Sequence, residues 1–339
     1  MVFYFPVIKL TKEKICAVGK GIAGKLPVFL FCVLFINGYN TWFGKENSIV
    51  GVILLMGLLM FLKADFGIDA KYSAVLVPLL FVSMGLCAKL SAWNPLVGLV
   101  VDAVFLSAAL LFTRLDATHS AYLPFFMGFL MLRGYDVTGE LFVKRMVSLA
   151  VIGYVVGLLH FLGSRKTCGH AQPSALLRGL SLYGPWERWA LSLTVTLLVT
   201  LLFGDLLSIP KSMWVNLTVL SLMMPIEDDL VRRRRLRIPA TILGCVLFIA
   251  LFGWLIPPDY QTAALLLAGF LSMFITSYFI KTVYNSFSAL VTATLLLPAK
   301  AAVLTRIGNN LIGAAVALLS LFLFNRIFLR LDQRRQNAA

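Results

Sequence analysis

The sequence predicts an all-α integral membrane protein of about twelve transmembrane helices, arranged as two six-helix pseudo-repeats. Hydrophobic residues make up 60% of the 339 residues and charged residues only 13%, and the mean hydropathy is +0.90. Soluble domains carry about 25% charged residues, so this chain has too little charge to cover a water-exposed surface. Apolar stretches of about 17–25 residues, the length of a helix that crosses a ~30 Å hydrocarbon core, recur from Leu26 to Phe328.

Residues 1–25 are predicted to form a basic cytoplasmic segment at the membrane surface, because they carry five lysines. They lack an apolar core followed by a cleavage pattern, so no signal peptide is expected. The five cysteines are scattered without a C-x-x-C pair, which predicts neither a disulfide framework nor a metal site.

The spans are expected in two halves, 26–163 and 186–329, joined by the polar cytoplasmic linker 164–185 and followed by a cytoplasmic tail, 330–339. Their approximate bounds are 26–43, 47–63, 71–90, 94–113, 120–133, 141–163, 186–206, 211–225, 237–257, 260–279, 284–299 and 305–328.

The net charge of +15 comes from cations that lie mostly between apolar stretches, on the side that the N-terminal segment would share. This is the positive-inside pattern, and it predicts that both termini are cytoplasmic. It also argues against a nucleic-acid partner, since the cations follow the membrane topology. The exceptions are Arg133, Lys144, Arg145, Lys300 and Arg306 on the predicted outer side, where either re-entrant spans or a basic vestibule that attracts anions would explain them.

Internal similarity supports the two halves. Ser48 and Ser212, Asp65 and Asp229, and Lys71 and Arg235 share one constant offset of 164 positions. Within the second half, "RIPATILG" from Arg237 and "RIGNNLIG" from Arg306 both begin with Arg-Ile and carry a glycine seven residues later. Transporter folds built from repeats show such self-similarity, with sites near the repeat interface.

Arg237 and Arg306 each lie inside an apolar helix, where a charge costs at least a few kcal/mol unless it reaches water, pairs or faces a polar cavity. Two readings stay open: the arginines extend to the interface, or they line an anion pathway. The glycine that follows each would let a neighbouring helix approach closely. The block 232–235, balanced by Glu227, Asp228 and Asp229, reads as a cytoplasmic anchor.

The passages "PIEDDLVRRRRLRIPATILG" and "LTRIGNNLIGAAVALL" resemble the fusaric acid resistance, or aromatic acid exporter, superfamily. That family has an Arg-x-x-Gly-Thr-x-x-Gly helix and an arginine in the last helix of a six-helix unit. This sequence has Pro-Ala-Thr where the family has Gly-Thr, although Thr241 and Gly244 match in type. The resemblance extends over roughly residues 20–330 and is closest to short members without a large cytoplasmic domain.

The resemblance implies an inner-membrane efflux transporter for small organic anions, aromatic or amphipathic, that works with a periplasmic membrane-fusion adaptor and forms a homodimer. Because no ATP site is found, a proton gradient or a partner would supply the energy. The main alternative is a passive anion channel, similar to the plant aluminium-activated malate channels. Two further alternatives are a structural subunit of a larger pump and a membrane-embedded lipid-modifying enzyme. The chain lacks G-x-S-x-G, H-E-x-x-H and phosphate-loop motifs, so neither an enzyme nor a bound cofactor is expected.

The candidate site residues follow from polar side chains inside apolar stretches. Asp102, mid-span, would be either a proton-coupling group or the salt-bridge partner of a pathway arginine. His160 would be a proton relay or an interfacial residue. Asn309 and Asn310 would line a polar route or bond between helices. The predicted substrate pathway comprises Arg237, Arg306, Arg145, Asn309, Asn310 and Thr241.

Two further groups carry open readings. Asp65 in one half, and Asp228 with Asp229 in the other, would form cytoplasmic turns with a gating role. The aromatic side chains Phe125, Phe126, Phe129, Tyr135 and Trp93 would form either an aromatic substrate surface or an interfacial belt.

Overall fold

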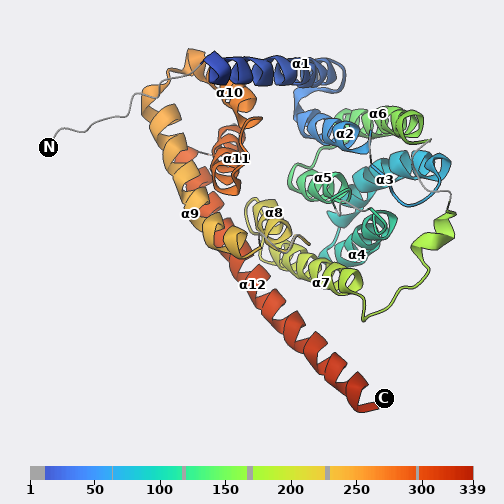
Figure 1. Ribbon diagram of the computed structural model, residues 1–339. Coiled ribbons are helices and arrows are strands. Elements are labelled where there is room, and N and C mark those ends of the chain that lie inside the picture. Colours follow the sequence, from blue (N-terminus) through green and yellow to red (C-terminus); the bar gives the residue numbers. More distant parts are fainter. Residues whose placement is uncertain are drawn as a thin grey trace.

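The computed structural model describes residues 12–62, 64–116, 120–165, 171–225, 230–294 and 298–338, and the regular structure within these ranges is helical (Figure 1). The first half comprises α1 Lys12–Phe43, α2 Ser48–Phe61, α3 Ala70–Ser91, α4 Pro95–Phe112, α5 Leu123–Gly134 and α6 Gly139–Ser164. The second comprises α7 Pro185–Leu206, α8 Met213–Leu222, α9 Leu230–Phe248 with the π-helical continuation η4 Ile249–Leu255, α10 Pro258–Ser272, α11 Tyr278–Ala293 and α12 Ala299–Ala338.

The all-α class and the multi-pass membrane character are confirmed. Within the described ranges, 7 helical segments are long and apolar enough to cross a membrane: those in α1, α3, α4, α6, α7, α9 with η4, and α12. The count of twelve crossing helices is not confirmed, because α5 and α8 have only 12 and 10 residues. At 1.5 Å per residue a 10-residue helix covers about 15 Å, half of a hydrocarbon core. The two-repeat layout and the domain bounds stay predictions.

Two helices continue beyond the expected spans. α1 begins at Lys12, within the basic segment that was expected to precede the first span. α12 has 40 residues and runs to Ala338, through the expected tail. Its far end is held at the start of α7, where Arg188 donates from Nη1 to Asp332 Oδ2 at 2.8 Å.

Buried phenylalanines form the core of the first half. The ring of Phe61 lies 5.3 Å from that of Phe125 and 5.4 Å from that of Phe66. Phe125, Phe126 and Phe129 are all fully buried, so they form neither a belt nor a substrate surface. Both expectations for these three were wrong because α5 is surrounded by α2, α3 and α8. Trp93, by contrast, is 82% exposed.

The second half has a smaller core cluster around Met213, Trp214, Phe248, Phe287 and Leu290, where α8, α9 and α11 meet. It is also connected to the N-terminal helix, because α1 lies beside α10 (Figure 1). There the rings of Phe29 and Phe270 are 5.2 Å apart, and Lys25 Nζ donates to Met273 O at 2.7 Å. The first helix of the chain therefore packs on α10 of the second half.

Candidate functional site

A row of polar side chains lies between α8, α9 and α12 in the second half. On α8 the residues are spaced four and three positions apart, which puts them on one helix face. On α9 and α12 they are four positions apart, again on one face each. The polar column, as we call this set, comprises Trp214, Thr218, Ser221, Arg237, Thr241, Arg306 and Asn310.

Asn310 lies at the centre of the polar column and connects its three helices. Its Oδ1 accepts from Thr218 Oγ1 at 2.8 Å and lies 3.5 Å from Thr241 Oγ1. Its Nδ2 donates to the carbonyl of Arg306 at 2.8 Å, one turn back on α12. Hydrogen bonding between helices, one of the two readings of Asn310, is therefore present, and it fixes the register of α8 against α12.

The two arginines of the polar column are buried and have no acidic partner among the residues that the structure describes. Arg237 donates weakly to the hydroxyls of Ser221 and Thr218, at 3.2 and 3.4 Å. The guanidinium of Arg306 lies over the Trp214 ring, 4.9 Å from its centroid. Arg237 is 9% exposed and Arg306 6%.

Within the described ranges, no carboxylate lies within 4 Å of either guanidinium. The Nε of each is buried and has no hydrogen-bond partner there. The two cations are also near enough to repel each other. This part of the bundle therefore holds two positive charges that the described protein groups do not compensate.

Gly313, seven residues after Arg306, makes the close helix contact that was expected of it. A Cβ at this position would lie 2.6 Å from the carbonyl oxygen of Val215 on α8. Gly244, seven residues after Arg237, is equally close to α11, where a Cβ would lie 2.5 Å from Val283 O. Both arginines are therefore followed by a point where two helix backbones nearly touch.

Arg145 and Asn309 lie away from the polar column, although they were predicted to share a pathway with it. Arg145 donates from Nε to Asn47 Oδ1 at 2.9 Å, just before α2. Asn309 donates to the carbonyls of Pro210 and Lys211, just before α8, at 2.8 and 2.9 Å. Arg145 and Asn309 thus fasten α6 and α12 to the turns that precede α2 and α8.

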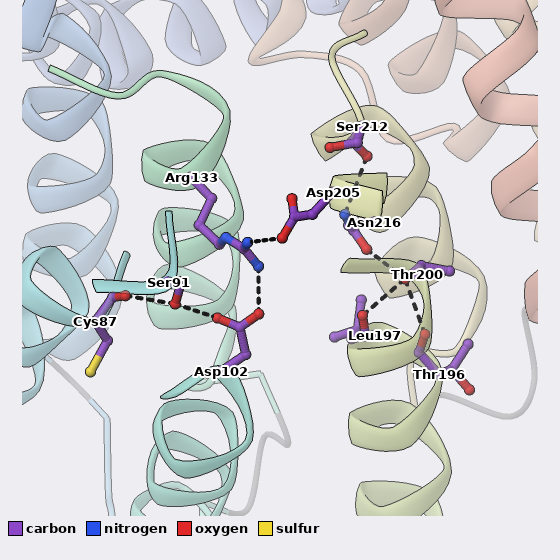
Figure 2. A network of polar contacts seen from close by, with 10 residues as sticks. All are labelled: Cys87, Ser91, Asp102, Arg133, Thr196, Leu197, Thr200, Asp205, Ser212 and Asn216. Atoms are coloured by element: carbon purple, nitrogen blue, oxygen red, sulfur yellow. Dashed lines mark hydrogen bonds and ion pairs between the residues drawn. The ribbon is translucent and has the colours of Figure 1, made fainter. Parts of the chain in front are cut away.

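Asp102 belongs to a second polar cluster, shown in Figure 2, in which Arg133 connects it to Asp205. Arg133 Nη1 donates to Asp102 and Nη2 donates to Asp205, so the guanidinium on α5 bridges α4 and α7. Ser91 Oγ also donates to Asp102, at 2.5 Å. Asp102 is therefore ion-paired with Arg133, which was not one of the predicted pathway arginines, and its proton-coupling role stays a prediction.

This cluster borders a cavity of about 480 Å³. Its wall is made by the α3–α4 turn, the end of α5, the end of α7 and the start of α8. Arg133, Asp205 and Asn216 are among its polar lining residues. Asn216 accepts from Thr200 at 2.5 Å, so the polar surface continues along α7 (Figure 2).

His160, on α6, is buried against α2 and α3, and both of its ring nitrogens make hydrogen bonds. Its Nδ1 lies 2.8 Å from the carbonyl of Phe61, so this nitrogen carries a proton and donates. Its Nε2 lies 2.7 Å from the hydroxyl of Ser73. A neutral imidazole that accepts from Ser73 satisfies both contacts, and the ring ties the end of α2 to α3 and α6.

Asp65 lies in the turn between α2 and α3, where its Oδ1 accepts from the backbone of Gly67 at 2.8 Å. Gly67 has φ +71°, the left-handed region that favours glycine, so Asp65 stabilises this tight turn. Asp69, four residues later, caps α3 by accepting from Lys71 N. Asp228 and Asp229, expected to form the matching turn, lie outside the described residues.

Sequence reasoning missed Asp205 entirely and treated Arg133 only as part of a basic outer set. Both residues lie at the end of an apolar stretch, where a charge ordinarily faces the interface. A signal was nevertheless present, because the acid Asp102 and the base Arg133 lie in neighbouring spans of one half. An ionised carboxylate inside a membrane-spanning segment is costly unless a cation pairs with it, and Arg133 is a cation in a neighbouring span.

The apolar helices define the class: a multi-pass membrane protein. Within that class, residues 197–320 match the model of a family described as fusaric acid resistance protein-like. The predicted resemblance is confirmed over this stretch, which contains the whole polar column and Asp205, and it indicates a role in membrane transport or efflux. No curated protein and no solved structure matches the chain significantly.

Proposed function

We propose that the protein exports small organic anions, aromatic or amphipathic, across the bacterial inner membrane, and that Arg237 and Arg306 bind the anion in the polar column. One observation carries this proposal: two buried guanidiniums on adjacent helices with no carboxylate partner among the described residues. An arginine in an ion pair is already neutralised by its partner, whereas two buried cations without such partners favour the binding of an anionic ligand.

The energetic argument is direct. A lone arginine in the hydrocarbon region costs a few kcal/mol, and a second cation nearby adds repulsion. An organic carboxylate removes both penalties, since a guanidinium binds it through two parallel N–H bonds. The Nε of each arginine has no hydrogen-bond partner in the described part of the chain, so it is free to donate.

The apolar part of the substrate also finds a suitable surface. The Trp214 ring lies under Arg306 and belongs to the apolar cluster with Phe248 and Phe287. An aromatic acid could place its carboxylate on the arginine and its ring against these side chains, as aromatic pairs prefer offset or edge contacts. Charge and apolar surface lie together, which favours amphipathic anions over inorganic ones.

The proposal has further parts. Delivery to a periplasmic membrane-fusion adaptor comes from the family resemblance. Cytoplasmic termini come from the positive-inside pattern, and coupling to the proton gradient through Asp102 or His160 comes from titratable side chains inside apolar stretches. A homodimer is proposed as well. A passive anion channel would use the same arginines, and the direction of flux under a gradient separates it from a carrier.

The test is counterflow of a labelled aromatic carboxylate, benzoate, in proteoliposomes that contain the full chain. We expect Arg237→Gln and Arg306→Gln each to lower flux at least tenfold, since a charged hydrogen bond is worth about 1.5–3 kcal/mol. The matched control is Arg326→Gln, an exposed arginine on α12 that lies over the Phe322 ring, and it should retain flux.

Unchanged flux in both variants, at normal expression, would contradict the anion site. An imposed pH gradient then separates the modes: uphill uptake that needs the gradient indicates a carrier, and purely downhill flux a channel. Absence of flux with every aromatic carboxylate tested would overturn the transport proposal and favour the enzyme alternative.

A further inference from the structure

Lys211 lies in the turn between α7 and α8, at the end of the polar column where α8 begins. Trp214, the first residue of the polar column on α8, donates its backbone N–H to the carbonyl of Lys211 at 2.9 Å. In the predicted topology this turn faces the outer side of the membrane. The turn is therefore where an exported anion would leave the polar column.

Helix α12 holds this turn beside Arg306. Asn309, one turn after Arg306, donates from Nδ2 to the carbonyls of Pro210 and Lys211, at 2.8 and 2.9 Å. Helices α8 and α12 also lie side by side (Figure 1). The backbone of Lys211 is thus fixed next to the part of α12 that carries Arg306.

The turn has an unusual backbone conformation. Lys211 has φ +52° and Ser208 has φ +49°, in the left-handed region that favours glycine. This conformation is unfavourable for other residues, so it persists where surrounding contacts hold it, often at binding sites. The two hydrogen bonds from Asn309 are such contacts. The position of the Lys211 backbone is therefore imposed by α12 and not by local preference.

The ammonium of Lys211 lies over an aromatic ring, as the guanidinium of Arg306 does. Its Nζ is 4.4 Å from the centroid of the Tyr135 ring, at the end of α5. Tyr135 packs against the apolar cluster that contains Trp214, the ring under Arg306. Tyr135 and Arg306 are also near enough to interact electrostatically. Lys211 and Arg306 therefore flank one aromatic cluster.

Lys211 has no carboxylate within 4 Å among the residues that the structure describes, although it is half-buried. The acid nearest to it along the chain, Asp205, is paired with Arg133. Two other lysines on the predicted outer side, Lys89 and Lys144, each have a carboxylate partner. The face of a tyrosine ring attracts the ammonium but leaves its charge uncompensated.

We propose that Lys211 is the outermost anion-binding residue of the polar column, which receives the carboxylate of an exported organic anion from Arg306 and releases it outside. This inference rests on the proposed export function. An ammonium has three donors, so Lys211 can bind a carboxylate while it keeps its contact with Tyr135. The transfer is non-covalent, and no bond of the anion is made or broken.

The order of the cations suits release. A guanidinium binds a carboxylate through two parallel N–H bonds, whereas an ammonium is a compact and strongly hydrated point charge. The carboxylate is therefore held tightly at the buried arginines and more weakly at Lys211. Passage of an ion requires this combination, with binding strong enough for entry and several sites weak enough for departure.

The first experiment measures binding at Lys211 without transport. The purified full chain is acetylated in detergent with an N-hydroxysuccinimide ester, and the rate at each lysine is followed by mass spectrometry. Benzoate is compared with chloride at equal ionic strength. We expect benzoate to slow acetylation of Lys211 by about threefold relative to chloride, the effect of one accessible ion pair.

The matched control is Lys45, an exposed lysine just before α2, which should react equally fast in both salts. Equal rates at Lys211 in benzoate and chloride would overturn the assignment. Equal slowing of Lys211 and Lys45 by benzoate would overturn it as well, because that result indicates a general effect of the salt.

The second experiment measures benzoate counterflow in proteoliposomes. Lys211→Met should raise the benzoate concentration at half-maximal flux by about threefold, and Lys211→Arg, which keeps the charge, should restore it. Lys45→Met should leave it unchanged. An unchanged value in Lys211→Met, or a defect that Lys211→Arg shares in full, would contradict the role of the charge.

Failure of this inference and failure of the arginine site give different results. If Arg237→Gln and Arg306→Gln lose flux while benzoate leaves Lys211 unprotected, the assignment of Lys211 fails alone. If both arginine variants keep normal flux while benzoate protects Lys211, the arginine site fails and the binding of a carboxylate at Lys211 stands.

Discussion

Substitution of Gly313 by alanine tests whether close packing of α12 on α8 holds the polar column together. The added Cβ would lie 2.6 Å from Val215 O and 2.8 Å from Thr218 Cβ. Optimal non-bonded contacts lie near 3.5 Å, so the helices must separate by roughly 0.9 Å. Overpacking of this kind costs about 1–3 kcal/mol. Thr218 would move away from Asn310, whose oxygen it contacts at 2.8 Å.

The matched control is Gly308→Ala on the same helix, because a Cβ there has nothing within 4 Å. Removal of a glycine from a helix interior should stabilise this variant by about 0.5–1 kcal/mol. The assay is thermal unfolding of the purified full chain in detergent, where 1 kcal/mol corresponds to about 2–4 °C for a large domain. Equal shifts for the two variants, or a higher midpoint for Gly313→Ala, would refute the packing argument.

Two further substitutions test the buried polar contacts. Arg133→Met leaves Asp102 and Asp205 without their cation and should lower the free energy of unfolding by about 3–5 kcal/mol. Lys89→Met, from a partly exposed pair, should change it by about 0–1 kcal/mol, and equal effects in thermal unfolding would contradict the bridging role of Arg133. His160→Phe removes the hydrogen bonds to the Phe61 carbonyl and to the Ser73 hydroxyl and should cost about 1–3 kcal/mol, measured in the same way. An unchanged midpoint would mean that these contacts are not structural.

Local patterns predicted the helices well because they depend on hydropathy along the chain. Every described α-helix overlaps an expected span, and α7, Pro185–Leu206, agrees within one residue of the expected 186–206. The largest differences are at α1 and α12, which continue past their apolar segments. Helix propensity continues where hydrophobicity stops, so hydropathy locates a span better than the end of its helix.

Of the predicted pathway residues, some lie together in the structure and others lie elsewhere. Arg237, Arg306 and Asn310 do lie together, because an arginine in an apolar helix indicates a polar environment wherever the helix packs. Arg145 and Asn309 looked equally suitable, yet they bond to the turns before α2 and α8. Their distance from the polar column depends on which helix face they occupy and which helix that face meets.

The sequence alone determined that this protein lies in a membrane and where its helices run. It also identified the charged residues that lie inside apolar spans, where an unpaired charge is costly. These are properties of composition and of local hydropathy, and they need no knowledge of neighbours. Only the tertiary structure decided that Arg133 pairs with both Asp102 and Asp205, which come from different helices in both halves of the chain. The physical reason is that an ion pair depends on the distance between side chains, and the packing of buried cores sets that distance by fixing each helix's neighbours and rotation.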